Sequence, residues 1–333
     1  MSVEEIVRDV RVRGDEAVRE WALRLDGAEP ASAIATEAPA EAVLALAGAV
    51  RRWHAAQRPS DLTLEVAPGV RLERRWVPVP SVGIYVPRGL VSTLVMCAVP
   101  ALEAGVEEIV VVTPPRGAGP IAAAAELLGL EPPLALGGPQ AIAWLAYVRR
   151  VAKIVGPGSA PVNEAKLLVS RDVPIDLPAG PSEVVVLAGR GADRDVAALE
   201  LAAQAEHGPG STCLLVEANG DLEAAFARVE ELAPEHLVLL GDAERLAPRV
   251  RNAGAVFVGA SSPVAAGDYA TGGNHVLPTG GWARSVGGLG LETFLKPVTV
   301  QRVTPRGLEG LRPVVEALAA VEGMPAHAAA VRR

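Results

Sequence analysis

Residues 82–113, VGIYVPRGLVSTLVMCAVPALEAGVEEIVVVT, determine the predicted fold. They begin with a β-rich run at 82–86, continue with a helical pattern at 94–104 and end with a second β-rich run at 108–113. Two short apolar runs joined by a helix are typical of a βαβ unit, whose strands are parallel and buried. The stretch therefore predicts an α/β protein.

The same alternation continues towards the C-terminus. It predicts further strands at 134–136, 153–155, 183–187, 212–217, 236–240 and 256–258, and helices at 121–128, 140–149, 193–207 and 221–232. This pattern indicates two incomplete Rossmann-like βα domains with mostly parallel sheets.

The flanking segments have other patterns. Apolar residues have helical spacing in 2–12, 14–25 and 40–57, whereas 62–72 alternate with period two around Pro68-Gly69, which predicts a hairpin. The tail contains a strand candidate at 298–303 and a helix at 307–321. We therefore expect a helical N-terminal segment, an extended and helical C-terminal arm, and three domains: 1–81 together with 183–288, an inserted 82–182, and 289–333.

Composition excludes several classes of protein. The chain has 333 residues and a net charge of −8 that is spread along its length, which argues against a nucleic-acid partner. No apolar run approaches the roughly 18 residues of a membrane span, and the acidic start MSVEEIVRDV does not resemble a signal peptide. Cys97 and Cys213 lie in apolar surroundings and are expected to be buried, reduced thiols. We expect a cytoplasmic protein without a membrane partner.

Three loops rich in glycine or proline follow predicted strands: Val86-Pro87-Arg88-Gly89, Gly137-Gly138-Pro139-Gln140 and Val155-Gly156-Pro157-Gly158-Ser159. Backbone N–H groups in such loops can bind a phosphate at the start of a helix. None of the three is a G-x-G-x-x-G fingerprint, so their glycine content alone favours plain strand-to-helix turns over a phosphate site.

Four of the five histidines accompany a Gln, Glu or Asp in a loop or at the end of an element. Gln204 and His207 share one face at the end of a helix, where a histidine can also simply complement the helix dipole. Asp268 and His275 lie in 267–275, which is expected to be a long polar loop. His327 follows Glu322 near the C-terminus, whereas His54 is expected to be a surface or structural residue.

The pair Glu235-His236 stands at the start of a predicted strand. Such a pair can supply an acid/base group and its electrostatic partner. Neighbouring residues of a regular strand point to opposite faces, so the two share a site only where the chain is irregular. The residue types together allow a zinc site of mixed nitrogen and oxygen ligands, but their spacing alone does not assemble it.

Taken together, five segments resemble the histidinol dehydrogenase family from about residue 75 to the end of the chain. They are Ile175-Asp176-Leu177-Pro178-Ala179-Gly180-Pro181-Ser182-Glu183, Gln204-Ala205-Glu206-His207-Gly208, Pro234-Glu235-His236-Leu237, Ala266-Gly267-Asp268-Tyr269-Ala270 with Gly273-Asn274-His275-Val276-Leu277-Pro278-Thr279, and Glu322 with Ala326-His327. The resemblance implies a zinc- and NAD-dependent oxidoreductase that oxidises L-histidinol through L-histidinal to L-histidine, the last step of histidine biosynthesis.

The resemblance also implies roles for individual residues. One Zn²⁺ per subunit would be held by Gln204, His207, Asp268 and His327. Glu235 and His236 would be the catalytic acid/base pair. Substrate contacts would come from Ser182, His275 and Glu322, in addition to His236 and the metal ligands. NAD contacts would come from Tyr85, Gln140 and Ser159.

In the family, the residues matching Glu322 and His327 reach the active site of the other subunit. The resemblance therefore implies a homodimer with 289–333 as its dimerisation arm, the zinc and acid/base residues in 1–81 with 183–288, and NAD on 82–182.

The chain departs from the family pattern in three places. It is shorter, with only 28 positions from His207 to Glu235, it has Arg88-Gly89 where Gly-Gly is usual, and Ser159 stands where asparagine is usual. Two alternatives therefore stay open. One is a catalytically altered paralogue that binds zinc and a ligand, and the other is a dehydrogenase of another amino alcohol.

Overall fold

The computed structural model describes residues 2–178, 180–208 and 210–332. Ala179 and Pro209, which fall in or beside two of the segments quoted above, lie outside the described residues. The chain divides into two compact units, Met1–Gln57 with Val79–Phe294, and Arg58–Pro78 with Leu295–Arg333.

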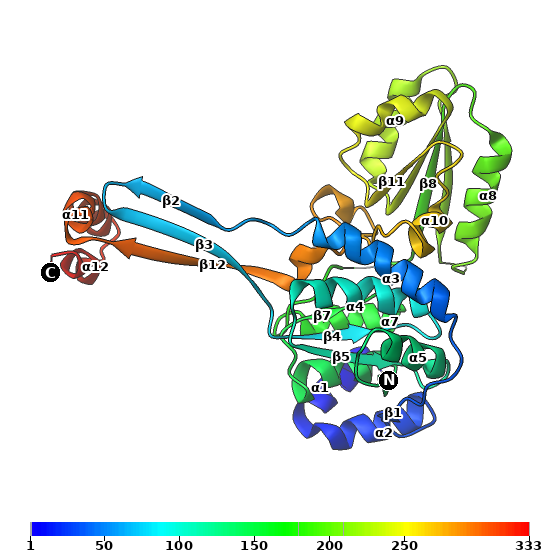
Figure 1. Cartoon of the computed structure of the whole chain (residues 1–333), viewed down its shortest axis with the longest axis horizontal. Helices are drawn as coiled ribbons and strands as arrows, with labels where there is room; N and C mark the ends of the chain where they lie inside the picture. Colours follow the sequence, from blue (N-terminus) through cyan, green and yellow to red (C-terminus); the bar gives the residue numbers. More distant parts are fainter. Residues whose placement is uncertain (1, 179, 209, 333) are drawn as a thin grey trace. The chain divides into compact units, whose positions relative to one another are not determined.

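The first unit contains a five-stranded sheet in the order β1-β6-β5-β4-β7 (Figure 1). Its strands are β1 (Ala31–Ser32), β4 (Ser81–Tyr85), β5 (Glu108–Thr113), β6 (Leu134–Ala135) and β7 (Ile154–Val155). All neighbouring pairs are parallel except β1 with β6. Every residue of β4 is buried, as expected for an apolar strand in the middle of a parallel sheet.

The helices of this part are α1 (Val3–Arg13), α2 (Asp15–Leu25), α3 (Ala40–Ala55), α4 (Val91–Ala104), α5 (Ala118–Leu127), α6 (Gly138–Ala143) with a π-helical turn at Trp144–Val148, and α7 (Ala160–Val169). Val10 of α1 and Ala17 of α2 share one apolar core with Ile142 and Val169. The sequence grouped 1–81 with 183–288, but these contacts join α1 and α2 to the five-stranded sheet. Apolar spacing shows that a helix has a buried face, but it does not show which sheet that face covers.

The first unit also contains a four-stranded, fully parallel sheet in the order β11-β10-β8-β9. Its strands are β8 (Glu183–Ala188), β9 (Thr212–Glu217), β10 (His236–Leu240) and β11 (Ala255–Val258). The helices are α8 (Arg194–Ala205), α9 (Leu222–Leu232), α10 (Val264–Tyr269) and 3-10 turns at Gly241–Arg249, Trp282–Arg284 and Leu291–Phe294.

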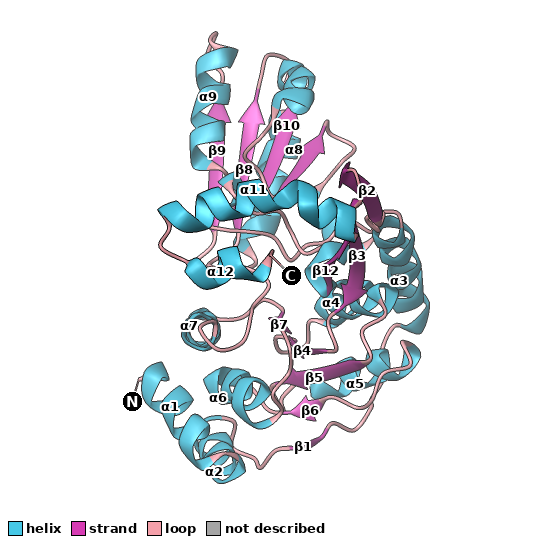
Figure 2. Ribbon diagram, turned by 90° about the vertical axis from the view of Figure 1, so that its left-hand side faces the viewer, coloured by secondary structure: helices cyan, strands magenta, loops and turns pink. Residues whose placement is uncertain are grey.

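Alternate residues of β8 face opposite sides of this second sheet. Val185 packs with Phe226 of α9, whereas Val186 packs with Ala197 of α8. The two helices therefore cover opposite faces, and Figure 2 shows the strands lying between them. Both sheets confirm the predicted α/β class with mostly parallel strands.

The second unit contains the predicted hairpin. β2 (Leu62–Ala67) and β3 (Val70–Pro78) pair around Pro68-Gly69, and β12 (Leu295–Val303) pairs antiparallel with β3 along its whole length. Gly69 has a φ of +75°, and a Cβ there would meet Thr304, so the turn requires glycine. The unit ends with α11 (Pro305–Val321) and α12 (Pro325–Ala330). The sequence did not reveal that the hairpin and the C-terminal arm form one sheet.

Other expectations from the sequence need correction. The segment 267–275 is not wholly irregular, because Asp268 lies in α10, a helix too short for its period to be seen. Helices α7 and α12 and the 3-10 turn Gly241–Arg249 were missed as well. Cys97 is buried as predicted, but Cys213 is exposed because β9 is an edge strand. No helix within the described residues is long and apolar enough to cross a membrane.

Candidate active site

A cavity of about 640 Å³ opens within the first unit. It is lined by His236 of β10 and by loop and helix residues that include Ser159, Ser182, His207, Glu235, Asp268 and His275. The strands β4 and β7 end at this cavity, where the loops after parallel strands gather. The structure therefore brings together six of the residues predicted to bind metal or substrate or to catalyse, along with one predicted NAD contact.

Glu235 lies immediately before β10 and is held by two hydrogen bonds. Its Oε2 accepts from the Ser182 hydroxyl at 2.7 Å and from the Glu183 backbone N–H at 2.8 Å. Ser182 in turn accepts from the Gln204 side-chain amide at 2.9 Å. Because both bonds to Glu235 use Oε2, its Oε1 has no hydrogen bond within the described part of the chain.

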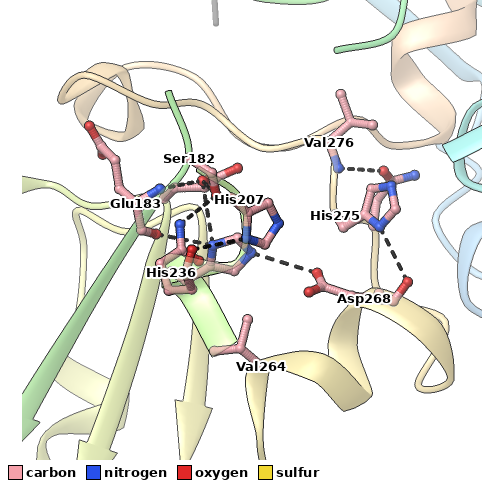
Figure 3. Close-up of polar contacts among 12 residues, drawn as sticks. Ser182, Glu183, His207, His236, Val264, Asp268, His275 and Val276 are labelled. Atoms are coloured by element: carbon pink, nitrogen blue, oxygen red, sulfur yellow. Dashed lines mark hydrogen bonds and ion pairs between the residues drawn. The ribbon is translucent and has the colours of Figure 1, made fainter. Parts of the chain in front are cut away.

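His236 is the first residue of β10 and is 5% exposed. Its Nδ1 lies 3.1 Å from the Glu183 carbonyl and 3.5 Å from Glu235 Oε2 (Figure 3). A carbonyl only accepts, so Nδ1 carries the hydrogen and Nε2 is the basic nitrogen. Glu235 and His236 share the site because Glu235 precedes the regular strand.

Burial opposes protonation of His236, but the hydrogen bond and charge of Glu235 and the charge of Asp268 outweigh it. The pKa of His236 therefore lies above its ordinary value. Asp268 Oδ1 is 4.0 Å from His236 Nε2, so a carboxylate faces the basic nitrogen across the cavity.

Gln204 and His207 come from the C-terminal end of α8. Gln204 is buried, and the His207 Nδ1–H donates to the Gln204 carbonyl at 3.2 Å, which leaves His207 Nε2 available to a ligand. His207 therefore bonds a carbonyl at the end of α8, where the sequence allowed it to complement the helix dipole, and it also lines the cavity.

Glu200 connects this helix to Asp268. Its carboxylate accepts from the N–H of Val264, the first residue of α10, at 3.1 Å, and four residues later α10 carries Asp268. Burial raises the pKa of Glu200. The helix that carries Gln204 and His207 thus also holds the start of the helix that carries Asp268.

His275 is fixed by two groups. Its Nδ1–H donates to the Asp268 carbonyl, and its Nε2 accepts from the Thr93 hydroxyl, both at 3.2 Å. Burial lowers the pKa of His275 despite the charge of Asp268. The ring is therefore neutral at pH 7 and presents itself as a hydrogen-bonding group.

His54 is a structural residue and not a surface residue, which were the two roles expected from the sequence. It is fully buried in α3, its Nδ1 is 2.8 Å from the Val50 carbonyl, and its Nε2 is 3.4 Å from the Asn274 amide. Asn274 also donates to the Met96 carbonyl. His54 therefore helps to hold the segment that presents His275.

The donor set fits a zinc ion only in part within this unit. Gln204, His207 and Asp268 offer an amide oxygen, an imidazole nitrogen and a carboxylate oxygen, which suit zinc. Among the described residues, no three His, Cys, Asp or Glu side chains lie close enough together to hold a metal. The fourth predicted ligand, His327, belongs to α12 of the second unit, and Glu322 follows α11 there.

The predicted NAD residues occupy two places. Ser159 lines the cavity, but Tyr85 and Gln140 are buried and are not part of its wall. The Tyr85 hydroxyl accepts from the Gly138 N–H at 3.4 Å, and burial raises the pKa of Tyr85 to about 12. Gln140 donates to Asp26, while its buried Oε1 has no partner among the described residues.

In two of the glycine loops, a backbone N–H group already donates to a carboxylate of the protein. The N–H of Gly137 donates to Asp26 at 2.9 Å, and that of Gly156 donates to Asp176 at 2.8 Å. These two N–H groups are therefore not free for a phosphate in this conformation.

A family model described as histidinol dehydrogenase matches residues 1–227 and 218–333. The chain is 37% identical to histidinol dehydrogenase of Methanosarcina mazei, and the alignment covers 99% of this chain and 90% of that protein. It is 38% identical to histidinol dehydrogenase of Escherichia coli K12, with the same coverage. The chain belongs to the histidinol dehydrogenase family. It is therefore an oxidoreductase of that family, as the five sequence segments implied.

A solved structure supports the assignment to the histidinol dehydrogenase family. The crystal structure of histidinol dehydrogenase from Elizabethkingia anophelis superposes with a TM-score of 0.89 at 30% identity, covering 99% of this chain and 90% of that one. Succinate-semialdehyde dehydrogenase from Burkholderia pseudomallei shares the fold alone, with a TM-score of 0.54 at 14% identity. The alignment with the M. mazei enzyme spans 392 positions against 333 residues here, which agrees with the shortening seen in the sequence.

The sequence did not identify several residues that shape this site. Thr93 orients His275, the Thr279 hydroxyl accepts from the Gly180 N–H, and Lys166 pairs with Asp176 beneath the cavity. Asp176 and Thr279 stood within the quoted segments, but Thr93 and Lys166 lie on helices with no chemical signal nearby. Only the tertiary contacts identify them.

Proposed function

We propose that this enzyme oxidises L-histidinol to L-histidine through L-histidinal, with Zn²⁺ and two molecules of NAD. The observation that carries the proposal is the buried Glu235–His236 pair, held by Ser182 and Glu183 in a cavity that also receives His207, Asp268 and His275. A carboxylate and an imidazole at one cavity wall supply the two bases that the two oxidations need.

The first oxidation needs a base for the alcohol proton. The His236 Nε2 accepts that proton as the carbon–oxygen double bond forms and a hydride leaves the same carbon. The raised pKa of His236 favours this transfer, and the Glu183 carbonyl and Glu235 carboxylate stabilise the imidazolium that results.

The second oxidation needs water to add to the aldehyde. Glu235 takes a proton from that water through its free Oε1 while Ser182 and the Glu183 N–H hold its Oε2. The resulting aldehyde hydrate gives a hydroxyl proton to His236 Nε2 as the second hydride leaves the same carbon, and the carboxylic acid that forms releases its remaining proton to solvent to give the carboxylate.

Zinc and NAD would each supply a different part of the chemistry. When bound, NAD would supply the hydride acceptor, and zinc would supply a Lewis acid that anchors a substrate amine and imidazole. Gln204, His207 and Asp268 of one subunit would hold the metal together with His327. His275 and Ser182 contact the substrate, and Tyr85, Gln140 and Ser159 contact NAD.

A homodimer in which Glu322 and His327 complete the partner's site is part of this proposal. Val314, Leu318 and Val321 follow each other at helical spacing on α11 and are all more than half exposed. On β2, Leu62, Leu64 and Val66 are also about half exposed. A small unit with two exposed apolar faces is suited to bind another protein surface. The zinc donor set of the first unit also lacks its fourth ligand. Both features support a second copy of this chain as the binding partner.

The test is NAD reduction by L-histidinol with metal-replete protein. The proposal expects turnover that a chelator abolishes and added Zn²⁺ restores. Binding of zinc without turnover would instead identify the altered paralogue. A higher kcat/KM with a different amino alcohol in a substrate panel would identify the other dehydrogenase.

A further inference from the structure

The loop Gly156–Ser159 is fastened by one face of the helix that follows it. Asn163 and Lys166 lie three positions apart on α7, so they share a face. The Asn163 side-chain amide donates to the Gly158 carbonyl at 2.8 Å, and the Lys166 ammonium donates to the Gly156 carbonyl at 2.7 Å. The carbonyls of Gly156 and Gly158 are thus both bonded to side chains of α7.

Asn163 is only half satisfied by this arrangement. It is 7% exposed and lines the cavity, yet its buried Oδ1 has no hydrogen-bond partner among the described residues. A buried acceptor without a donor is unfavourable, and such groups in native proteins usually find a partner from a ligand or water. Asn163 thus lines the cavity and carries a buried oxygen that lacks a hydrogen-bond donor.

The surroundings of this atom suit a nucleotide. The helix α7 has ten residues and begins directly after Ser159, so the positive end of its dipole lies at the loop. The Ser159 side chain makes no capping hydrogen bond to the first N–H groups of the helix. Ser159 is also the predicted NAD residue that lines the same cavity.

We propose that Asn163 is a cofactor-binding residue whose Oδ1 accepts a hydrogen bond from the dinucleotide. The inference rests on the proposed function, because it takes NAD as the cofactor. The donor is a hydroxyl or an N–H group of the dinucleotide. NAD analogues, each lacking one of these donors, show which group bonds Asn163.

The test compares NAD binding by calorimetry in the full-length wild type and Asn163→Leu, which keeps the size of the side chain but neither donates nor accepts. We expect the Kd for NAD to rise roughly three- to tenfold, as for the loss of one hydrogen bond. The matched control is Asn252→Leu, since Asn252 also donates its amide to a backbone carbonyl, that of Glu230, but does not line the cavity. The control is expected to bind NAD like the wild type.

A structural role through Gly158 alone would weaken every analogue equally. The same measurement is therefore repeated with NAD analogues lacking the carboxamide N–H, one ribose hydroxyl or the adenine amine. We expect one analogue to bind wild type and Asn163→Leu with the same Kd. An unchanged Kd for NAD in Asn163→Leu, or an equal variant-to-wild-type ratio with every analogue, overturns the inference. Failure of the proposed function is seen separately, as wild-type protein that binds NAD but does not reduce it when histidinol is added.

Discussion

At the scale of single residues, the division of labour between Glu235 and His236 follows from which atoms are already bonded. His236 keeps Nε2 free and Glu235 keeps Oε1 free, because Nδ1 and Oε2 are engaged by Glu183 and Ser182. Each base therefore has one atom for one proton transfer.

Substituting Glu235→Gln separates the two oxidations. The amide cannot take a proton from water, so oxidation of supplied L-histidinal should fall by about 10²-fold or more, the usual contribution of a general base. Oxidation of histidinol to the aldehyde should fall less, because His236 remains. Stopped-flow measurement with each substrate checks this, and equal losses in both steps would contradict the assigned role.

His54 makes stability depend on pH. Burial lowers its pKa from the ordinary 6.5, so the unfolded chain binds the proton more readily than the folded one. Stability from this group is complete above about pH 6.5 and is lost as the pH falls below it. Urea titrations of wild type and His54→Leu from pH 7.5 to 5 should show a smaller loss in the variant. An equal loss would show that His54 does not titrate with unfolding.

At the scale of elements, the Lys166–Asp176 pair connects α7 to the segment that leads into β8. The ammonium and carboxylate lie 2.6 Å apart with side chains 2% and 1% exposed, and Asp176 also accepts from the N–H groups of Gly156 and Leu177. The pair therefore ties the loop at Ser159 to the segment that delivers Ser182.

Replacing Lys166 alone should lower the stability of the protein more than replacing both Lys166 and Asp176. Lys166→Met leaves a buried, unpaired carboxylate and should lower the free energy of unfolding by about 3–5 kcal/mol. Adding Asp176→Asn should recover part of that loss, because the charge is then gone. Urea unfolding of both variants measures this. A double variant less stable than Lys166→Met would contradict the explanation.

The sequence predicted the alternating strands and helices because each buried strand is a continuous apolar run and each long helix has a clear period. It missed α10 and α12, which have six residues each and no detectable period. It named the acid/base pair and the metal donors through motif resemblance, since no spacing along the chain brings Gln204 near Asp268. It missed Thr93 and Lys166 because their roles depend entirely on tertiary contacts.

At the scale of the whole molecule, the proposed dimer makes each active site depend on two chains. Asp268→Ala and His327→Ala should each be inactive as homodimers. Refolded together in equal amounts, they should regain roughly a quarter of wild-type activity, because half of the dimers are mixed and one of the two sites in each is intact. Activity of the mixture no higher than that of the separate variants would contradict the shared site.

A four-electron oxidation at one cavity consumes two molecules of NAD for each histidinol, so the stoichiometry of the complete reaction tests it. Limiting L-histidinol is given to the zinc-loaded wild type with excess NAD, and NADH and L-histidine are quantified at completion. We expect two NADH and one histidine for each histidinol consumed. One NADH with accumulation of the aldehyde, or none at all, would contradict it.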